Sequence, residues 1–215
     1  MKSIILAAGR GSRMASLTHN SPKCLTTING KTLIDHQLET LTQAGIKDIA
    51  IVTGYKAECL KQYGTHHFHN PYWERTNMVA SLLCGQTWLD ESDCIISYSD
   101  IFYAPQIVKD LSACEDNVAI SYDPKWLDLW SKRFNNPLED AETFRISSNN
   151  YLLSIGEKAS RTEEIQGQYM GLLKFKKEFW QTLVQSKITC NYAKIDMTSF
   201  LNLLISKNYK IKALR

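Results

Sequence analysis

The chain has 215 residues, 44% of them hydrophobic, and 25 basic against 22 acidic side chains, for a net charge of +3. This size and composition allow one well-buried domain, 1–215. The small charge excess includes no basic block of the kind that binds nucleic acid, and no apolar run is long enough for a signal segment or a membrane span. We therefore expect a cytoplasmic protein without nucleic-acid or membrane partners, whose ligand is a small anion.

The first half of the chain alternates short apolar runs with amphipathic segments. Residues 3–7 form a predicted buried strand that leads into a glycine loop. Thr32 can cap a helix over 33–44, and Gly45 stands where a C-terminal glycine cap belongs. Further strands are predicted at 48–52, 94–98 and 118–122, and helices at 57–63, 76–88 and 105–113.

After Pro124 the pattern changes. Residues 125–140 are aromatic and charged, and two short strands at 143–147 and 151–155 flank an Asn149-Asn150 turn. A strand at 168–175 and helices at 176–185 and 197–205 follow. The whole pattern predicts an α/β fold of the Rossmann-like type, a mostly parallel sheet with helices on both faces. We interpret 125–170 as an insertion that faces the substrate.

The loop after the first strand has the residues expected of a phosphate site. It reads Leu6-Ala7-Ala8-Gly9-Arg10-Gly11-Ser12-Arg13. Small residues let backbone N–H groups approach phosphate oxygens, and the two arginines add fixed charge suited to bidentate contact. A bare strand-to-helix turn would not explain two arginines at a turn that binds nothing.

Two other glycine motifs fit less well. A dinucleotide fingerprint requires a third glycine where Met14 stands, and an acidic residue where the second predicted strand ends in Thr53-Gly54-Tyr55. A Walker A loop at Gly30-Lys31-Thr32 requires a glycine where Leu25 stands, and no strand leads into it. Both interpretations are therefore disfavoured.

The glycine loop, followed by Ser21-Pro22-Lys23, resembles the signature of nucleotidylyltransferases of the sugar-phosphate and phosphocholine type. That signature runs L-A-A-G-x-G-x-R and then, after a spacer, x-P-K. Further matches occur at 53–55, at Asp100, at 156–158 and at 167–171. The segments 130–134 and 136–143 resemble the CTP:phosphoglutamine cytidylyltransferases that help to build capsular phosphoramidate in bacteria.

The resemblance implies a reaction in which an oxygen of the acceptor's phosphate attacks the α-phosphorus of an NTP, with CTP the expected nucleotide, and pyrophosphate leaves. It implies Mg²⁺ as cofactor, and CTP and a small phosphorylated metabolite as partners. Four residues would act in catalysis: Lys23 at the α-phosphate, Arg13 at the leaving pyrophosphate, Asp100 at Mg²⁺, and Lys158 at the acceptor's phosphate. The implied nucleotide-binding residues are Leu6, Ala7, Ala8, Gly9, Arg10, Gly11, Ser12, Gly54, Tyr55, Asn77 and Ser81.

The insertion would hold the acceptor. The residues assigned to it are Trp130, Arg133, Glu139, Glu142 and Tyr169. A quaternary ammonium would require aromatic rings with nearby acids, whereas an amino acid phosphate would require an arginine and an acid. Composition leaves both open, as it leaves open simple packing of the tryptophans. The resemblance favours phosphoglutamine or a similar small zwitterion.

Several alternatives remain open. A sugar-1-phosphate nucleotidylyltransferase would use UTP, GTP or dTTP, and a non-catalytic regulatory domain would bind a nucleotide without turnover. The family usually has a second metal-binding aspartate after the final helix, but the chain ends at Arg215, and capping is expected for Asp196. His66, His67 and His69 are predicted to lie in a loop without a metal, and the cysteines to be reduced packing residues. A homodimer remains possible.

Overall fold

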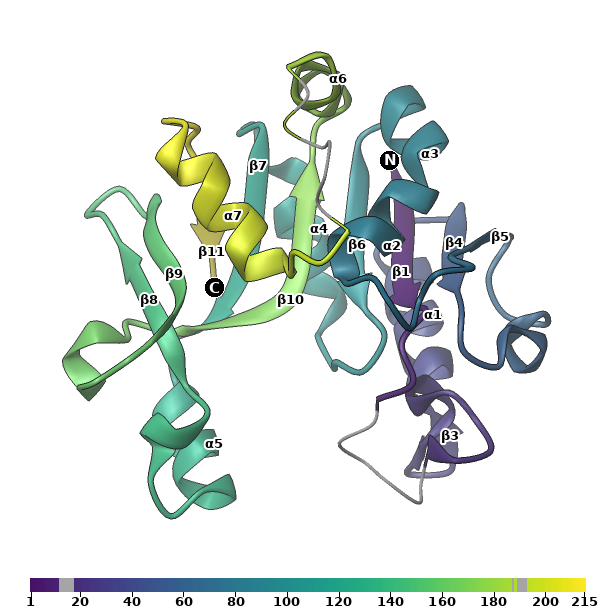
Figure 1. Ribbon diagram of the computed structural model, residues 1–215, viewed down its shortest axis with the longest axis horizontal. Coiled ribbons are helices and arrows are strands. Elements are labelled where there is room, and N and C mark those ends of the chain that lie inside the picture. Colours follow the sequence, from purple (N-terminus) through teal and green to yellow (C-terminus); the bar gives the residue numbers. More distant parts are fainter. Residues whose placement is uncertain (12–17, 187, 189–192) are drawn as a thin grey trace.

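The computed structural model describes residues 1–11, 18–186, 188 and 193–215. At its centre lies a seven-stranded sheet in the order β11–β7–β10–β6–β1–β4–β5 (Figure 1). The strands are β1 (Lys2–Ala7), β4 (Ile49–Thr53), β5 (His66–His69), β6 (Cys94–Tyr98), β7 (Val118–Asp123), β10 (Gln168–Phe175) and β11 (Lys212–Leu214). All neighbouring pairs are parallel except the two that β10 makes with β6 and β7. The α/β class and the mostly parallel sheet are confirmed.

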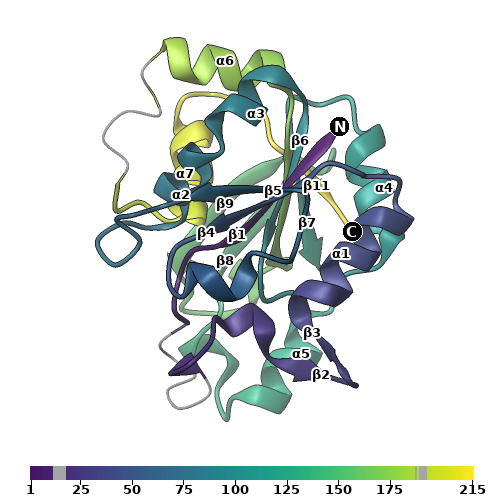
Figure 2. The same ribbon diagram turned by 90° about the vertical axis from the view of Figure 1, so that its right-hand side faces the viewer.

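Helices cover both faces of this sheet (Figure 2). One face carries α1 (Leu33–Gln43) and α4 (Pro105–Ala113). The other carries α2 (Met78–Cys84), α3 (Gln86–Glu91), α6 (Lys177–Gln185) and α7 (Met197–Ser206). Within β1, Ile4 packs toward the second group of helices and Ile5 toward the first, and both side chains are fully buried. Burial on both faces explains why these strands are continuous apolar runs. No helix in the described part of the chain has the length and hydrophobicity to span a bilayer.

Local signals place several helix ends where the sequence predicts them. The Thr32 side chain accepts a hydrogen bond from the Asp35 backbone N–H, and the Asp35 carboxylate accepts one from the Thr32 backbone, which forms a capping box at the start of α1. Gly45 follows α1 with a φ of +91°. Pro105 opens α4 at its first turn, where its missing N–H costs no hydrogen bond.

The predicted helix at 76–88 is wrong in one respect, because it is two helices. Gly85 leaves helical geometry at φ −93° and ψ 15° and separates α2 from α3. A Cβ at this position would lie 3.1 Å from Ile4 Cδ1 on the neighbouring strand. The absence of a side chain at the break therefore lets it lie close to β1.

The prediction of a loop around His66, His67 and His69 is also wrong, because these residues form the edge strand β5. An edge strand has one neighbour and one row of solvated groups, so it does not require a continuous apolar run. Phe68 alone of the four is apolar, and it packs on Trp88 with ring centroids 5.8 Å apart.

The segment between β7 and β10 forms a separate layer. It contains α5 (Trp126–Arg133), η4 (Pro137–Glu139), the antiparallel hairpin β8 (Glu142–Ile146) and β9 (Leu152–Lys158), and η5 (Thr162–Glu164). In Figure 1 this hairpin stands at the left, next to α7. Backbone hydrogen bonds of 2.9 Å, from Leu152 to Ile211 and from Ala213 to Asn150, connect it to the β11 edge of the central sheet. The remaining short elements are η2 (Lys23–Leu25), the ribbon β2 (Thr27–Ile28) and β3 (Lys31–Thr32), and η3 (Ala57–Leu60).

The sheet topology brings distant segments to one edge. The carboxyl ends of the parallel strands β1, β4 and β6 meet there, as they do in open α/β sheets that bind ligands. Because β10 runs antiparallel to β6, its first residues, Gln168 and Tyr169, reach the same edge. The glycine loop, the turn after β6 and the start of β10 are therefore neighbours.

Candidate active site

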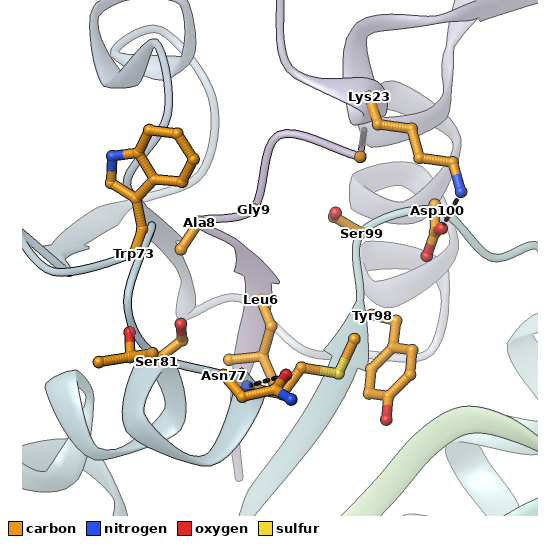
Figure 3. Close-up of a pocket in the computed structure, with 13 residues that line it drawn as sticks. Leu6, Ala8, Gly9, Lys23, Trp73, Asn77, Ser81, Tyr98, Ser99 and Asp100 are labelled. Atoms are coloured by element: carbon orange, nitrogen blue, oxygen red, sulfur yellow. Dashed lines mark hydrogen bonds and ion pairs between the residues drawn. The ribbon is translucent and has the colours of Figure 1, made fainter. Parts of the chain in front are cut away.

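A cleft of about 210 Å³ opens at this edge, and Figure 3 shows its lining. Eight residues assigned from the sequence contribute to it: Leu6, Ala8, Gly9, Gly11, Lys23, Asn77, Ser81 and Asp100. Five others also line it: Trp73, Thr76, Met78, Tyr98 and Ser99. Trp73 and Ala8 lie on one side, with Lys23 and Asp100 on the other. The lining combines small residues with one cation and one carboxylate.

Lys23 and Asp100 meet directly, although 77 residues separate them in sequence. The Lys23 ammonium donates a hydrogen bond to an Asp100 carboxylate oxygen. Their side chains remain 30% and 31% exposed, so both heads face the open side of the cleft. Each charge is therefore accessible to a ligand that could replace its present partner.

Gly11 leaves room for the stem of this lysine. Its φ of +72° is a conformation that favours glycine, and a Cβ there would lie 3.0 Å from Lys23 Cβ and 3.1 Å from Lys23 Cδ. The second glycine of the loop thus has a packing reason of its own, beside the phosphate contact predicted from the sequence. Beneath Lys23, burial raises the pKa of the Cys24 thiol to about 12, so this cysteine is a packing residue and not a nucleophile.

The turn that carries Asp100 is held by a buried glutamine that the sequence analysis missed. Gln37 of α1 donates hydrogen bonds to the carbonyl oxygens of Tyr98, at 2.9 Å, and Ile101, at 3.0 Å. Its own amide oxygen accepts from the Ser97 hydroxyl at 3.0 Å. The sequence signal for this role is that a polar residue, Gln37, lies between Ile34 and Leu41 on the apolar face of α1.

A second buried amide, Asn70, shapes the opposite wall of the cleft. Its Nδ2 donates to the hydroxyls of Thr76, at 2.9 Å, and Ser81, at 3.0 Å, and its Oδ1 accepts from the Tyr72 backbone N–H. Asn70 is only 3% exposed, and its bonds close the loop that presents Trp73 to the cleft. The only sequence signal for this role of Asn70 is its position next to Pro71 in a turn.

Gly54 packs against the start of the glycine loop, and Tyr55 is hydrogen-bonded to the chain that follows the loop. A Cβ on Gly54 would lie 2.6 Å from the Ala8 carbonyl oxygen and 2.7 Å from Trp73 Cβ. The Tyr55 hydroxyl donates to the carbonyl oxygens of Thr18 and His19. The Arg10 guanidinium lies 5.7 Å from the centre of the Tyr55 ring. Neither Tyr55 nor Arg10 lines the cleft.

The remaining residues assigned to the nucleotide and its reaction lie elsewhere. Ala7 is buried among the residues that pack toward α1 and α4, because its side chain points to the other face of β1. Ser12 and Arg13 lie outside the described residues. Lys158 ends β9 opposite Glu142 in the hairpin, and it lines neither this cleft nor the next.

A second pocket of about 280 Å³ continues from the first, because Met78 and Tyr98 line both. Its other lining residues come from the hairpin, the start of β10 and the start of α7: Glu142, Thr143, Phe144, Ile155, Gln168, Tyr169, Asp196 and Thr198. Two of the residues assigned to the acceptor, Glu142 and Tyr169, are therefore in a pocket that adjoins the cleft of Lys23 and Asp100.

The second pocket is acidic. Partial desolvation raises the pKa of Glu142, and the negative charges of Asp196 and Asp140 raise it further. Burial likewise raises the pKa of Tyr169, with a smaller contribution from the adjacent Tyr98. The two tyrosine rings meet edge to face with centroids 5.8 Å apart. Asp196 caps α7 as expected, and its carboxylate also faces this pocket.

The other residues assigned to the acceptor do not line either pocket. Trp130 packs edge-on against Trp126 at 6.2 Å, and the Arg133 guanidinium lies 5.2 Å from the centre of the Trp130 ring. Glu139 is exposed in η4. These side chains build the outer part of the insertion, where the Trp126 indole donates to the Ile165 carbonyl oxygen at 3.2 Å.

The three histidines of β5 have separate partners. The ring nitrogens of His66, His67 and His69 lie near the Thr65 hydroxyl, the Leu60 carbonyl oxygen and the Thr53 hydroxyl, respectively. Among the described residues, no three His, Cys, Asp or Glu side chains gather as a metal cluster. A divalent ion at Asp100 would thus take one carboxylate, with phosphate and water as its other ligands.

Comparison with known proteins agrees with this geometry. Residues 3–151 match the MobA-like NTP transferase domain. The chain is 40% identical to the CTP:phosphoglutamine cytidylyltransferase of Campylobacter jejuni, across 99% of this chain and 91% of that protein. It is 42% identical to the choline-phosphate cytidylyltransferase of Streptococcus pneumoniae over 38% of each chain.

Solved structures support the same fold. The inositol-1-phosphate CTP transferase of T. maritima superposes with a TM-score of 0.77 at 17% identity, covering 99% of this chain and 84% of that one. The CTP:phosphocholine cytidylyltransferase of Streptococcus pneumoniae superposes with a TM-score of 0.72 at 20% identity, covering 100% and 90%. The family resemblance inferred from the glycine loop and Lys23 is confirmed: the chain belongs to the MobA-like NTP transferase family and is a nucleotidyltransferase of the cytidylyltransferase type.

Proposed function

We propose that this enzyme transfers CMP from CTP to the phosphate of a small, phosphoglutamine-like metabolite and releases pyrophosphate. One observation carries the proposal. Lys23 and Asp100 meet in a cleft of small residues, and this cleft continues past Met78 and Tyr98 into a second pocket. The two compartments match a reaction that joins two substrates at one phosphorus.

The relatives support this choice of substrates. The Campylobacter jejuni protein, similar along 99% of the chain, is a CTP:phosphoglutamine cytidylyltransferase. Shorter similarities extend to choline-phosphate and 2-aminoethylphosphonate cytidylyltransferases. Their named acceptors are phosphates or phosphonates that also carry nitrogen. A hexose phosphate acceptor fits an acidic second pocket less well.

The residues of the first cleft can be assigned to the nucleotide. Backbone N–H groups at Gly9 and Gly11 would donate to the triphosphate, and Ser12 and Arg13 would extend this contact to the leaving pyrophosphate. Leu6, Ala8, Asn77 and Ser81 would border the nucleoside, while Ala7, Arg10, Gly54 and Tyr55 would hold the loop in place. Fixed backbone donors lose no free energy to reorganisation when charge develops.

Lys23 would exchange Asp100 for phosphate when the nucleotide binds. Its ammonium is a mobile point charge on a flexible stem, suited to the α-phosphate as negative charge shifts during displacement. Asp100 would then be free to hold Mg²⁺, for which one carboxylate beside a phosphate site is an adequate donor set. The bound ion would supply charge neutralisation to the phosphates.

The hairpin would bring the acceptor to this centre. We infer that 1–215 act as one nucleotidylyltransferase domain, in which 125–170 provide most of the acceptor's surroundings. Lys158, at the end of β9, would attract the acceptor's phosphate, and Glu142 and Tyr169 would contact its remaining atoms. A CTP-consuming enzyme of this kind is expected in the cytoplasm.

The test is a matrix of nucleotides and acceptors, read as pyrophosphate release. CTP, UTP, GTP and dTTP are each combined with L-glutamine phosphate, phosphocholine and glucose 1-phosphate in the presence of Mg²⁺. We expect turnover with CTP and a nitrogen-bearing acceptor. A preference for UTP, GTP or dTTP with glucose 1-phosphate would replace the proposal with a sugar nucleotide activity. Nucleotide binding without pyrophosphate in any combination would indicate a regulatory domain.

A further inference from the structure

The residues that line the second pocket indicate which group of the acceptor, other than its phosphate, the enzyme binds. Its lining comes from five parts of the chain that lie far apart in sequence: the start of α2, the end of β6, the β8–β9 hairpin, the start of β10 and the start of α7. It joins the nucleotide cleft at Met78 and Tyr98. An acceptor whose phosphate lies near Lys23 would therefore extend its other end into this pocket.

The charges in this lining have one sign. Glu142 and Asp196 are its two ionisable carboxylates, and no lysine, arginine or histidine occurs among the described residues that line it. Lys158 is the cross-strand partner of Glu142 but is not part of the lining. Partial desolvation and the negative charges of Asp196 and Asp140 raise the pKa of Glu142, while a hydrogen bond with the Thr198 side chain lowers it.

Within the described residues, the side-chain hydrogen bonds of Asp196 all involve the same carboxylate oxygen. Its Oδ1 accepts hydrogen bonds from the Ser199 backbone N–H, at 2.7 Å, and the Thr198 hydroxyl, at 3.2 Å. These bonds cap α7 and fix the orientation of the side chain. Its Oδ2 takes part in none of these bonds. The helix cap therefore fixes the orientation of a carboxylate whose residue lines the pocket.

A buried hydroxyl in the same pocket also lacks a partner. The Tyr169 hydroxyl is enclosed and makes no hydrogen bond of normal geometry within the described residues, although the neighbouring Tyr98 affects its pKa. An unsatisfied buried hydroxyl costs free energy that a polar ligand atom can recover. The Tyr98, Phe144 and Tyr169 rings complete a wall that favours a cation over an anion.

We propose that the second pocket binds the ammonium group of the acceptor, with the carboxylates of Glu142 and Asp196 as its hydrogen-bond acceptors. The enzyme then selects phosphorylated amines, and recognises the amine rather than any carboxylate of the acceptor. This inference rests on the proposed CMP transfer, because it assigns the second substrate of that reaction.

Three acceptors separate the groups that the pocket recognises. These are L-glutamine phosphate, the analogue in which hydrogen replaces its α-ammonium, and the analogue in which hydrogen replaces its α-carboxylate. With CTP and the full chain, we expect kcat/KM to fall at least about tenfold without the ammonium, as for other charged hydrogen bonds. Loss of the carboxylate should change it by only about threefold or less.

Two variants assign the preference to residues. Asp196→Asn keeps the cap of α7, because asparagine caps helices as well as aspartate, while it removes the charge. Glu142→Gln likewise removes the negative charge that the β8–β9 hairpin contributes to the pocket. Each should reduce the ratio of kcat/KM between the amine and the deaminated acceptor by about three- to tenfold, with an unchanged KM for CTP. Glu163→Gln, in the exposed turn η5 of the same insertion and outside the pocket, is the matched control and should leave the ratio unchanged.

The outcomes are distinct. Equal kcat/KM for the amine and the deaminated acceptor would overturn the inference and leave CMP transfer intact. An amine preference that survives both Asp196→Asn and Glu142→Gln would overturn the assignment to this pocket. Absence of pyrophosphate with every acceptor would instead refute the proposed function, and the inference with it.

Discussion

The two compartments of the site are built in different ways. The first cleft, which we propose binds the nucleotide, is formed mainly by backbone and small residues next to strand ends, and its lysine and aspartate contact each other. The second pocket is formed by side chains from distant segments, and its two acids have no basic partner in the described lining. Backbone donors suit the triphosphate common to all nucleotides, whereas side chains can be changed one at a time to suit an acceptor. The comparison predicts that mutations in the first compartment affect the chemical step and those in the second affect acceptor choice.

The largest effect should come from Lys23→Ala. We expect kcat to fall by at least about a hundredfold, because the lysine acts on charge that develops in the transition state. The melting temperature should hardly change, since Asp100 is left in contact with water and exposed ion pairs contribute little to stability. Lys31→Ala removes another exposed, paired lysine and is the control. Near-normal turnover in Lys23→Ala would place the catalytic charge elsewhere.

The next largest effect should come from Asp100→Asn. The Mg²⁺ concentration for half-maximal activity should rise at least about tenfold, because an amide oxygen is a weaker ligand than a carboxylate. The metal titration is compared with that of Asp110→Asn, which changes an exposed carboxylate on α4 that accepts from Gln106 at 2.7 Å. Identical Mg²⁺ titrations for the two variants would mean that Asp100 pairs with Lys23 and does not bind the ion.

Two glycine variants separate loop support from ligand access. Gly54→Ala should destabilise the fold by about 2 kcal/mol, because its Cβ would meet the Ala8 carbonyl oxygen and the Trp73 side chain. Gly9→Ala meets no described atom within 4 Å, so its melting temperature should match wild type while its KM for CTP rises about tenfold. Thermal unfolding and steady-state kinetics test both. A normal KM in Gly9→Ala would mean that the triphosphate does not approach this backbone.

The smallest expected effect is a change in the pH dependence of stability when Glu142 is replaced. Because its pKa is raised in the folded protein, its ionised form costs stability above that pKa, and this cost disappears as the pH falls through it. Glu142→Gln should therefore raise stability at neutral pH by a few tenths of a kcal/mol, a small figure because solvent screens this exposed carboxylate. The advantage should vanish in acid. Thermal unfolding between pH 4 and pH 8 measures it, and an advantage that grows in acid would contradict it.

The sequence predicted the nucleotide side of the fold well, because its signals are local. A continuous apolar run predicts a strand buried on both faces, Thr32 with Asp35 predicts a helix start, and Pro105 predicts another. The glycine loop and Lys23 are likewise short motifs. The strands at 94–98 and 168–175 have the predicted bounds for the same reason.

The acceptor side depends on contacts between distant residues. Asp196 has the sequence pattern of a helix cap, and only the packing of α7 beside the hairpin makes it part of the pocket lining. Gln37 and Asn70 are ordinary polar residues until folding buries them against the turns they hold. Edge strand β5 lacks an apolar pattern because one of its sides faces water.

The register shift in β10 has a consequence for protein engineering. Its pairing with β7 slips between Tyr169 and Leu173, and Gly171 there has a φ of +78°, with the Tyr98 ring where a Cβ would stand. The shift separates the half of β10 that serves the hairpin from the half that belongs to the sheet. A graft that replaces the chain between β7 and Gly171 should therefore exchange one acceptor specificity for another as a cassette, without altering strand alignment in the host scaffold.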